Sequence, residues 1–390
     1  MANSLSAVSA RRQDDQLLSG ETHAGGDMID RQLYRAVTLF LIVKLTSLSV
    51  NIVRFPVLRH RPPVVGRTAD TVSLLVPMRN EATMLARSVP RILRQHVHEL
   101  IILDDQSTDG SAECARSWMQ QHSHARVVAG APAPPGWVGK SWACHQLSEL
   151  AVGSLLVFCD ADVLLGAGAV EAAVAEMRAQ HADVFSVFPR QITGTWGERL
   201  IIPLIDDVLL CFLPFGLLSL DVPAAATANG SLFAFTRSAY THLQGFAAVR
   251  EHLGIEDVMM ARRTRRAGLK LGVALGGRLV KTRMYTGYAE VIAGMGRGLL
   301  PVTGGSRSRL MAAAAWHVLA YFLPLLLAPT HRRWAIPLTL GIVERALVDV
   351  KTQHHVGWSI LLAPLSPVAA LPLFAQALRA RQQWKGRSYS

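Results

Sequence analysis

The sequence predicts an α/β fold in which a doubly wound, mostly parallel sheet is flanked by transmembrane or interfacial helices. Between residues 72 and 188, short apolar runs alternate with helical segments, which is the rhythm of repeated βαβ units. Acidic clusters follow apolar runs directly, and the first two are Asp104-Asp105 and Asp160-Ala161-Asp162. Hydrophobic residues make up 50% of the 390 positions, and the longest apolar stretches lie near the two ends of the chain.

The N-terminal part is expected to form a tail, a membrane helix and a basic linker. Residues 1–30 are polar and lack periodicity, which predicts a disordered tail rather than a signal peptide. A membrane helix is expected over residues 31–55. Its apolar part is residues 36–53, and eighteen helical residues at about 1.5 Å each just cross a hydrocarbon core of about 30 Å. Lys44 within this stretch keeps an amphipathic surface helix open as the alternative.

Residues 70–290 are expected to form the soluble domain. An apolar run of four to six residues bounded by turn residues is typical of a buried parallel strand. The expected strands are residues 72–76, 99–103, 126–129, 155–158 and 184–188, and the helices between them are residues 84–95, 111–121, 141–152 and 167–181. Ligands of open α/β sheets bind beyond the carboxyl ends of the strands, so the acidic clusters are expected to share one site.

The C-terminal part is again apolar. Residues 200–220 contain Pro and Asp, which favours an interfacial or re-entrant segment over a full span. Within the membrane region 308–378, residues 310–329 and 358–378 are strong membrane-helix candidates, and residues 334–343 are a weaker one.

Basic residues predict the orientation. The linker near residue 60 and the basic tail, 379–390, are both expected on the cytoplasmic side. Two spanning C-terminal helices with one interfacial helix would satisfy this expectation, whereas three spanning helices would place the tail opposite the soluble domain. We expect a multi-pass protein of the inner cell membrane with a cytoplasmic soluble domain.

Charge and cysteine usage exclude several classes. The net charge is +12, but the Arg residues are dispersed and no aromatic-interleaved basic repeat occurs, so no nucleic-acid partner is expected. The four cysteines form no C-x-x-C pair, and no disulfide framework or structural zinc site is indicated.

The Asp160-Ala161-Asp162 triplet predicts a metal site. Two carboxylates at positions i and i+2 after a strand offer hard oxygen ligands to Mg²⁺ or Mn²⁺, and such an ion can hold a diphosphate.

Three motifs together resemble the family 2 glycosyltransferases. They are SLLVPMRNE at residues 73–81, DDQSTDG at 104–110 and the Asp-Ala-Asp triplet, in matching order and strand context. The resemblance runs from about residue 72 to residue 288. It implies a GT-A-like fold, a nucleotide-sugar donor, most simply a UDP-sugar, and an inverting reaction.

The resemblance also implies residue roles on the donor side. Asp105 matches the acid that reads the uracil edge, although a capped turn remains the alternative for this cluster. Asp160 and Asp162 match the acids that address the ribose, the metal and the diphosphate, with Asp162 as the direct metal ligand. The nucleotide end of the donor site is assigned to Pro77, Asn80, Glu81 and Asp105.

Two later motifs resemble the phosphate-binding and base-bearing segments of the family. Lys140 lies in GWVGKSWA, similar to G-K-x-x-A, where a Lys that opens a helix can meet phosphate together with backbone amides. The run EDVMMARR at residues 256–263 resembles E-D-x-x-L-x-x-R. It implies Asp257 as general base, Glu256 as the next candidate and Arg263 as a donor contact. The alternative is that Glu256 and Asp257 only stabilise the helix N-terminus by their interaction with the helix dipole.

The KTRMY run at residues 281–285 departs from the Q/R-x-x-R-W pattern of processive and lipid-directed branches. Arg283 and Tyr285 are expected near the leaving diphosphate, where they would stabilise developing charge. The Arg-Met-Tyr version at residues 283–285 resembles the motif of membrane-anchored enzymes that glycosylate hydrophobic acceptors such as hopanoids and carotenoid acids. A lipid or isoprenoid alcohol or acid is therefore the expected acceptor.

Other functions remain as alternatives. Within the class, the chain would be a polysaccharide or polyprenyl-phosphate glycosyltransferase. A nucleotidyltransferase usually carries a Gly-rich basic loop after its first strand, and none follows Val76. A non-catalytic membrane scaffold would not need both Asp162 and Asp257.

Overall fold

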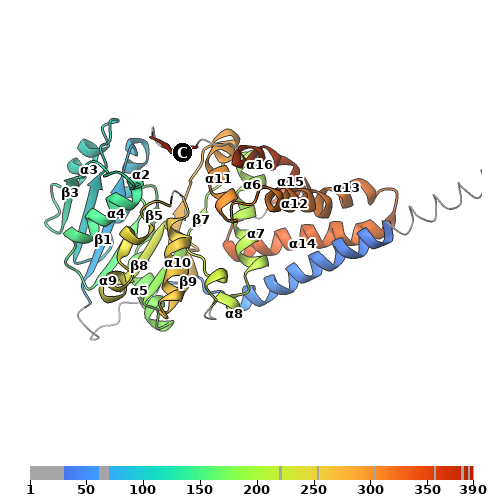
Figure 1. The fold of residues 1–390 in the computed structure, drawn as a ribbon, viewed down its shortest axis with the longest axis horizontal. Helices are drawn as coiled ribbons and strands as arrows, with labels where there is room; N and C mark the ends of the chain where they lie inside the picture. The colour runs from blue at the N-terminus through green and yellow to red at the C-terminus, as the bar shows by residue number, and fades with distance from the viewer. Residues whose placement is uncertain are drawn as a thin grey trace, which may run out of the picture.

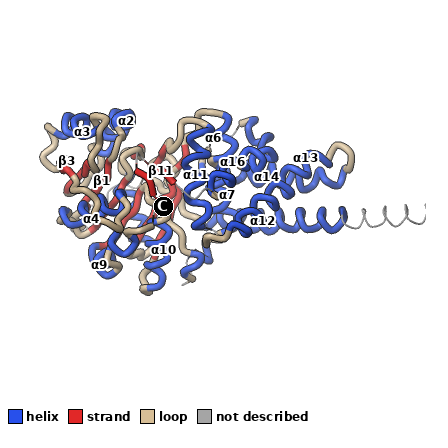
Figure 2. Tube along the Cα trace, turned by 45° about the horizontal axis from the view of Figure 1, so that its top comes forward, coloured by secondary structure: helices blue, strands red, loops and turns tan. Residues whose placement is uncertain are grey.

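The computed structural model describes residues 30–60, 70–218, 222–252, 254–302, 304–354, 357–378, 382–384 and 387–389. An α/β domain lies at one end of the molecule, and a bundle of helices extends from it (Figure 1). Figure 2 shows the same division, with the large sheet on one side and helices alone in the bundle. The expected N-terminal tail, apart from Asp30, lies outside the described residues, as do residues 61–69 and parts of the basic tail.

A seven-stranded sheet forms the core of the α/β domain, and it is mostly parallel, as predicted. β1 pairs in parallel with β2 and β4, β2 with β3, and β6 with β9. β8 lies between β4 and β6 and is antiparallel to both. Across the sheet the strands are β3 (Ala125–Ala129), β2 (Glu99–Asp104), β1 (Val72–Met78), β4 (Leu155–Cys159), β8 (Leu232–Thr236), β6 (Val184–Phe188) and β9 (Leu271–Leu275).

Helices cover both faces of the sheet, which confirms the doubly wound fold. Successive strand side chains point to opposite faces. Leu74 and Val76 of β1 therefore belong to the hydrophobic core with α2, α3 and α5, whereas Leu75 belongs to the core with α4 and α10. The helices of this domain are α2 (Ala82–Ile92), α3 (Ser111–Met119), α4 (Gly139–Leu150), α5 (Ala169–Ala179), α9 (Arg237–His242), η2 (Gly245–Val249) and α10 (Glu256–Arg266).

A second, three-stranded sheet lies at the carboxyl ends of the large sheet's strands. β10 (Val280–Thr282) pairs with β5 (Leu164–Leu165) and with β7 (Arg190–Gln191). This sheet brings the strand that leads to Arg283 beside the segment that follows Asp162.

Three helices among the described residues are long and apolar enough to cross a membrane. They are Asp30–Arg54, Arg307–Leu327 and Trp358–Ala377. The second comprises α12 (Arg307–His317), a π-helical turn (Val318–Phe322) and α13 (Leu323–Leu327). Residues 334–343, the weaker expected segment, belong largely to α14 (Ala335–Thr352), which lies along the N-terminal helix (Figure 1).

Lys44 lies inside the bundle rather than on its surface. Its side chain is 1% exposed, and its Nζ lies 2.8 Å from an Asp207 carboxylate oxygen and 2.7 Å from Glu344 Oε1. Nζ also donates to the Tyr321 hydroxyl at 2.6 Å. An amphipathic surface helix would keep this ammonium in water, so the burial of Lys44 argues against the amphipathic surface helix.

Residues 200–220 form no continuous helix. α6 (Trp196–Ile201) is followed by α7 (Pro203–Phe212) and α8 (Phe215–Leu218). α7 packs against the N-terminal helix, where Asn51 Nδ2 donates to Leu210 O at 2.7 Å and to Leu213 O at 2.9 Å. The remaining elements are η1 (Pro223–Ala225), α11 (Tyr288–Val302), η4 (Arg332–Trp334), η5 (Trp358–Leu365), α15 (Ser366–Ala369), α16 (Leu371–Ala377), β11 (Gln382–Trp384) and β12 (Arg387–Tyr389).

Candidate functional site

The predicted catalytic residues meet at the carboxyl end of β4. Lys140 at the start of α4 places its Nζ 2.6 Å from Asp160 Oδ1 and 3.8 Å from Glu256 Oε1. Asp257, at the start of α10, accepts a hydrogen bond from Gly230 N at 2.8 Å through Oδ2. Lys140, Asp160, Glu256 and Asp257 line one pocket together with Pro77 of β1. Asp160, Glu256 and Asp257, which are far apart in the sequence, thus line one pocket, whereas Asp105 and Asp162 are not among its lining residues.

Asp257 has the electrostatics of a proton acceptor near neutral pH. Withdrawal from bulk water and, to a smaller extent, the neighbouring Glu256 carboxylate raise the pKa of Asp257 from its ordinary 3.8 to about 7. The Lys140 ammonium and hydrogen bonds from the backbone amides of Val258 and Gly230 oppose the rise. A carboxyl that titrates near the operating pH is suited to general acid–base catalysis.

Lys140 remains an ammonium in this setting. Burial alone would lower its pKa, but the carboxylates of Asp160 and Glu256 outweigh burial and raise the pKa above its ordinary value. A Cβ on Gly230 would lie 3.4 Å from Lys140 Nζ and 3.6 Å from Asp257 Oδ2, so glycine keeps the space between these groups open. A fixed positive charge therefore faces this space from one side and a titratable carboxyl from the other.

Asp160 and Asp162, separated by Ala161, both lie in the turn where the chain leaves β4. Asp160 N donates to Ser231 O at 3.1 Å, which ties this turn to the loop before β8. Asp162 Oδ2 accepts from the Thr282 hydroxyl at 3.2 Å. The carboxylate oxygens of two acids at one turn fit a hard divalent cation. Thr282 is a contact that the sequence interpretation did not identify.

The nucleotide-side residues lie in two turns that are tied to each other. Asn80 adopts a positive φ of 50° after β1, a conformation that Asn tolerates better than most residues. Its Oδ1 accepts from Thr108 N at 2.9 Å, and its backbone N donates to Ser107 Oγ at 3.0 Å. Asp105 is 3% exposed, and its Oδ2 lies 3.8 Å from an Arg79 nitrogen. Glu81 N donates to the Ser111 hydroxyl at 2.8 Å.

Arg283 is held by a residue that the sequence interpretation missed. Glu198 is fully buried and meets the Arg283 guanidinium at 3.2 Å through Oε1 and 3.4 Å through Oε2. It also accepts from Gly194 N at 2.6 Å and from the Thr195 hydroxyl at 2.9 Å. Burial opposes ionisation, yet these hydrogen bonds hold the pKa of Glu198 below its ordinary value. The Thr195-x-x-Glu198 capping box was a signal in the sequence that could have found it.

Two predicted donor contacts are not brought to the pocket. Arg263 lies two helical turns from Glu256, where its Nε donates to Leu243 O at 2.8 Å and its Nη2 to Gln244 Oε1 at 3.1 Å. Tyr285 packs against α11 at Gly294 and joins the apolar cluster of α6, α11 and α16. In this structure Arg263 and Tyr285 therefore serve packing between elements, which corrects the expected donor contact of Arg263 and the expected place of Tyr285 near the leaving diphosphate.

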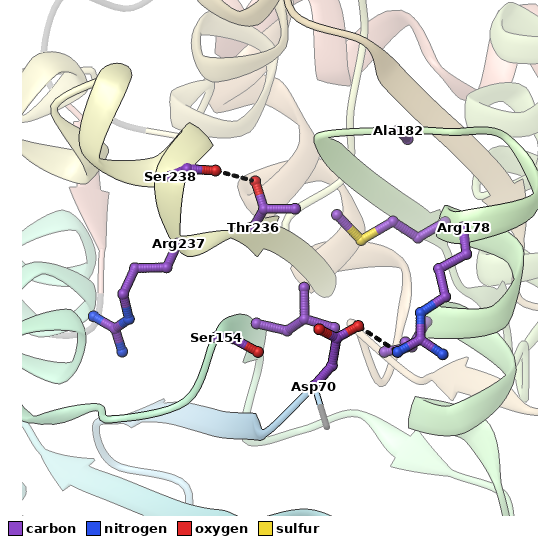
Figure 3. A pocket seen from close by; sticks show the side chains of 10 residues that line it. Asp70, Ser154, Arg178, Ala182, Thr236, Arg237 and Ser238 are labelled. Atoms are coloured by element: carbon purple, nitrogen blue, oxygen red, sulfur yellow. Dashed lines mark hydrogen bonds and ion pairs between the residues drawn. The ribbon is translucent and has the colours of Figure 1, made fainter. Parts of the chain in front are cut away.

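A larger cavity lies at the opposite edge of the sheet. It surrounds the start of β1 and β4 and the end of β8, where Asp70 pairs with Arg178 (Figure 3). Arg237 turns away from it to bond the carbonyl oxygens of Gly153 and Ala151 at 2.8 Å each. No predicted site residue lines this cavity, so it is separate from the site at the carboxyl ends.

Residues 73–226 match the family model described as Glycosyl transferase family 2. The match includes Asp105, Lys140 and the Asp160-Ala161-Asp162 turn, whereas Asp257 and Arg283 lie beyond it.

Curated proteins with similar sequences include several named 4,4'-diaponeurosporenoate glycosyltransferase. The protein from Staphylococcus haemolyticus is 27% identical over 250 residues, which cover 63% of this chain and 65% of that protein. The protein from Staphylococcus aureus strain USA300 is 26% identical over 337 residues, which cover 82% of this chain and 88% of that protein.

Solved structures with detectable similarity include two glycosyltransferases. The mannosyltransferase PcManGT from Pyrobaculum calidifontis, in complex with GDP-Man and Mn²⁺, is 17% identical with a TM-score of 0.48, covering 89% of this chain and 94% of its own. Glucosyl-3-phosphoglycerate synthase from Mycobacterium tuberculosis is 22% identical with a TM-score of 0.41, covering 61% and 83%. The match over residues 73–226 and the named relatives support a family 2 glycosyltransferase domain in this chain, and the mostly parallel α/β sheet agrees with the fold expected for it.

Proposed function

We propose that the protein is a membrane-anchored, inverting glycosyltransferase that moves a sugar from a nucleotide sugar to a hydrophobic acceptor. The observation that carries the proposal is the pairing of a near-neutral carboxyl, Asp257, with a fixed ammonium, Lys140, across the space beside Gly230. The curated relatives are named for a carotenoid acid, which supports an isoprenoid or lipid acceptor. The catalytic domain comprises residues 70–290.

The reaction is a single displacement. The acceptor oxygen attacks the anomeric carbon, the bond from that carbon to the diphosphate breaks, and the nucleoside diphosphate leaves with the bonding electron pair. With a hydroxyl acceptor, Asp257 takes the hydroxyl proton as the new bond forms. With a carboxylic acid acceptor, the acceptor is already ionised at neutral pH, and protonated Asp257 instead donates a hydrogen bond to it.

Asp160 and Asp162 would hold a divalent cation, Mg²⁺ or Mn²⁺, which when bound supplies positive charge beside the diphosphate. The Lys140 ammonium contributes charge of the same sign, because its Nζ lies 2.6 Å from Asp160 Oδ1. We assign Pro77, Asn80, Glu81 and Asp105 to the nucleotide of a UDP-sugar. Arg283 approaches the donor from the Glu198 side.

Membrane anchoring is the second part of the proposal. The apolar helices that extend from the α/β domain support an inner-membrane, multi-pass protein. Arg54 closes the N-terminal helix on the side of the α/β domain, which supports a cytoplasmic catalytic domain. Sedimentation of the full chain with carbonate-washed membranes tests the anchoring, and release into the supernatant would refute it.

The experiment that tests the chemistry is a transfer assay on these membranes. Radiolabelled UDP-glucose and UDP-N-acetylglucosamine are incubated with them, and the lipids are extracted and separated. Label in a lipid product supports the proposal. Label that stays in the donor under all conditions, or enters a polymer instead, contradicts the proposed acceptor class.

A further inference from the structure

The apolar segment Trp358–Ala377 is long enough to span a membrane, but its backbone is not one regular helix. It consists of the 3₁₀-helix η5, followed by the short helices α15 and α16. Pro364, Pro367 and Pro372 lie within it, and each removes a backbone donor that a continuous helix would use. The segment is therefore divided at points where its direction can change.

α14, rather than the segment Trp358–Ala377, packs along the full length of the N-terminal helix. At one end of the bundle, Trp334 Nε1 donates to Asp30 Oδ1 at 3.2 Å. At the other end, Lys351 Nζ donates to the carbonyl oxygens of Ile52 at 2.8 Å and Phe55 at 2.7 Å. α14 thus runs antiparallel along the whole N-terminal helix, and its 18 residues cover about 27 Å.

The middle of the segment Trp358–Ala377 enters the bundle only partly. Ala363 and Ser366 line a pocket with Gly341 and Glu344 of α14. Glu344 lies eight residues before the end of α14, about 12 Å along the helix axis. Gly341 lies eleven residues before that end, about 16.5 Å, so the segment reaches about the middle of α14.

Both ends of the segment lie near the α/β domain. The Trp358 ring lies 4.2 Å, centroid to centroid, from the ring of Trp196 at the start of α6. At the end of α15, Ala369 O accepts a hydrogen bond from the Tyr288 hydroxyl of α11 at 2.7 Å. Figure 2 shows β11, which follows the segment in the chain, beside the α/β domain rather than at the far end of the bundle.

Exposed aromatic and apolar side chains gather where the segment begins. Trp358 is 65% exposed and Trp196 is 42% exposed, and the Arg199 guanidinium lies 5.3 Å from the Trp196 ring centroid. Leu361 and Tyr288 are also exposed. Trp and Tyr with a nearby cation are typical of the headgroup layer of a bilayer.

We propose that Trp358–Ala377 is a re-entrant segment that enters the membrane from the side of the catalytic domain and returns to that side, with Trp196 and Trp358 in the headgroup layer. The partner of the exposed side chains around Trp196 and Trp358 is the lipid bilayer itself. The N-terminal helix, α12–α13 and α14 are then the segments that cross. The inference rests on the membrane anchoring proposed above, and it places the mouth of the catalytic domain at the membrane surface, where a lipid acceptor resides.

Cysteine labelling tests the path of the segment. In a Cys114→Ser background, in which the other three native cysteines are buried, Gly357→Cys and Leu378→Cys are treated with a membrane-impermeant maleimide. Inverted vesicles are compared with right-side-out ones. Glu113→Cys on α3, whose side chain is 76% exposed, marks the side of the catalytic domain.

The proposal requires both Gly357→Cys and Leu378→Cys to react from the same side as Glu113→Cys. Reaction of Leu378→Cys from the opposite side would mean that the segment spans, and reaction of Gly357→Cys from the opposite side would mean that α14 does not. Either result overturns the proposal. Failure of the protein to sediment with membranes would instead refute the anchoring on which the proposal rests.

Depth-dependent quenching tests the tryptophan pair. Lipids brominated near the headgroup should quench part of the fluorescence of the full chain in vesicles, and Trp196→Phe with Trp358→Phe should remove that part. Trp118→Phe is the matched control, because Trp118 is 41% exposed on α3 of the α/β domain. Equal loss of quenching in the control and in the double variant would overturn the assignment of Trp196 and Trp358 to the headgroup layer.

Discussion

Replacing Asp257 by asparagine is the most informative single change to the proposed mechanism. The amide keeps the shape of the carboxyl but cannot take up a proton. It can keep only one of the two backbone hydrogen bonds, since Oδ1 accepts from Val258 N at 2.7 Å and Oδ2 from Gly230 N at 2.8 Å. Loss of a general base costs about 10²–10⁴ in rate. With a hydroxyl acceptor, we therefore expect Asp257→Asn to lose transfer by this factor while it still binds the nucleotide.

The pKa of about 7 also fixes the expected pH dependence. At this pKa, about half of the Asp257 carboxyl is ionised at pH 7 and about 1% at pH 5. With a hydroxyl acceptor the ionised form acts, so the wild-type rate should fall roughly 50-fold from pH 7 to pH 5. With a carboxylate acceptor the protonated form helps, so the rate should fall as the pH rises above about 7. The direction of the profile thus reports the acceptor class.

Single-turnover transfer and equilibrium nucleotide binding, measured on the same preparations, distinguish a general base at Asp257 from a structural cap. Glu251→Gln serves as the control, because Glu251 is an exposed carboxylate close to the same helix. Near-normal transfer by Asp257→Asn would mean that the base lies elsewhere, with Glu256 as the next candidate. Loss of nucleotide binding as well would mean that Asp257 is a structural cap of α10.

Three further changes have defined outcomes. Asp105→Ala should weaken nucleotide binding by about 1–3 kcal/mol, measured by calorimetry, because a buried hydrogen-bond partner of the uracil ring is lost. Unchanged affinity would refute the assignment of Asp105 to the nucleotide. Chelation of divalent cations should abolish nucleoside diphosphate release, with recovery in Mn²⁺ or Mg²⁺, whereas full activity in chelator would remove the metal role of Asp160 and Asp162. Glu198→Gln should lower the free energy of unfolding by about 1.5–3 kcal/mol, because the Arg283 guanidinium loses its charged partner, and an unchanged thermal midpoint would show that this ion pair adds nothing.

The sequence predicted the parts of the fold that depend on local patterns. The apolar runs of β1, β2, β4 and β6 lie where they were expected, because buried parallel strands are short and bounded by turns. The antiparallel direction of β8 was not predicted, since the direction of a strand depends on the path of the chain through residues 189–231 and not on its own composition.

The site was predicted in its residue types more fully than in its contacts. Asp160, Glu256 and Asp257 were expected at one site, but the approach of Lys140 to both acids depends on the packing of α4 and α10. Arg263 was assigned by motif position alone, and the helical phase and length of α10 carry it to Leu243.

The membrane part shows where apolar content alone misleads. Residues 358–378 were a stronger membrane-helix candidate than residues 334–343, because hydropathy counts side chains and ignores the backbone. The prolines of the first segment break its helix, whereas α14 stays continuous and buries Glu344 against Lys44 of the N-terminal helix and Asp349 against Arg345 of α14 itself. Charged residues that find partners inside a bundle do not prevent a helix from lying there.

Transfer of labelled sugar into extracted lipid tests the central claim most directly. Membranes that contain the wild-type chain are compared with membranes that contain Asp257→Asn at equal protein levels, with labelled UDP-sugar and a divalent cation present. With an acceptor lipid that carries a hydroxyl group, the account predicts a labelled lipid product in the wild type and a loss of about 10²–10⁴ in its rate of formation in the variant. Equal amounts of labelled lipid from both membranes, or label in neither lipid fraction, would contradict it.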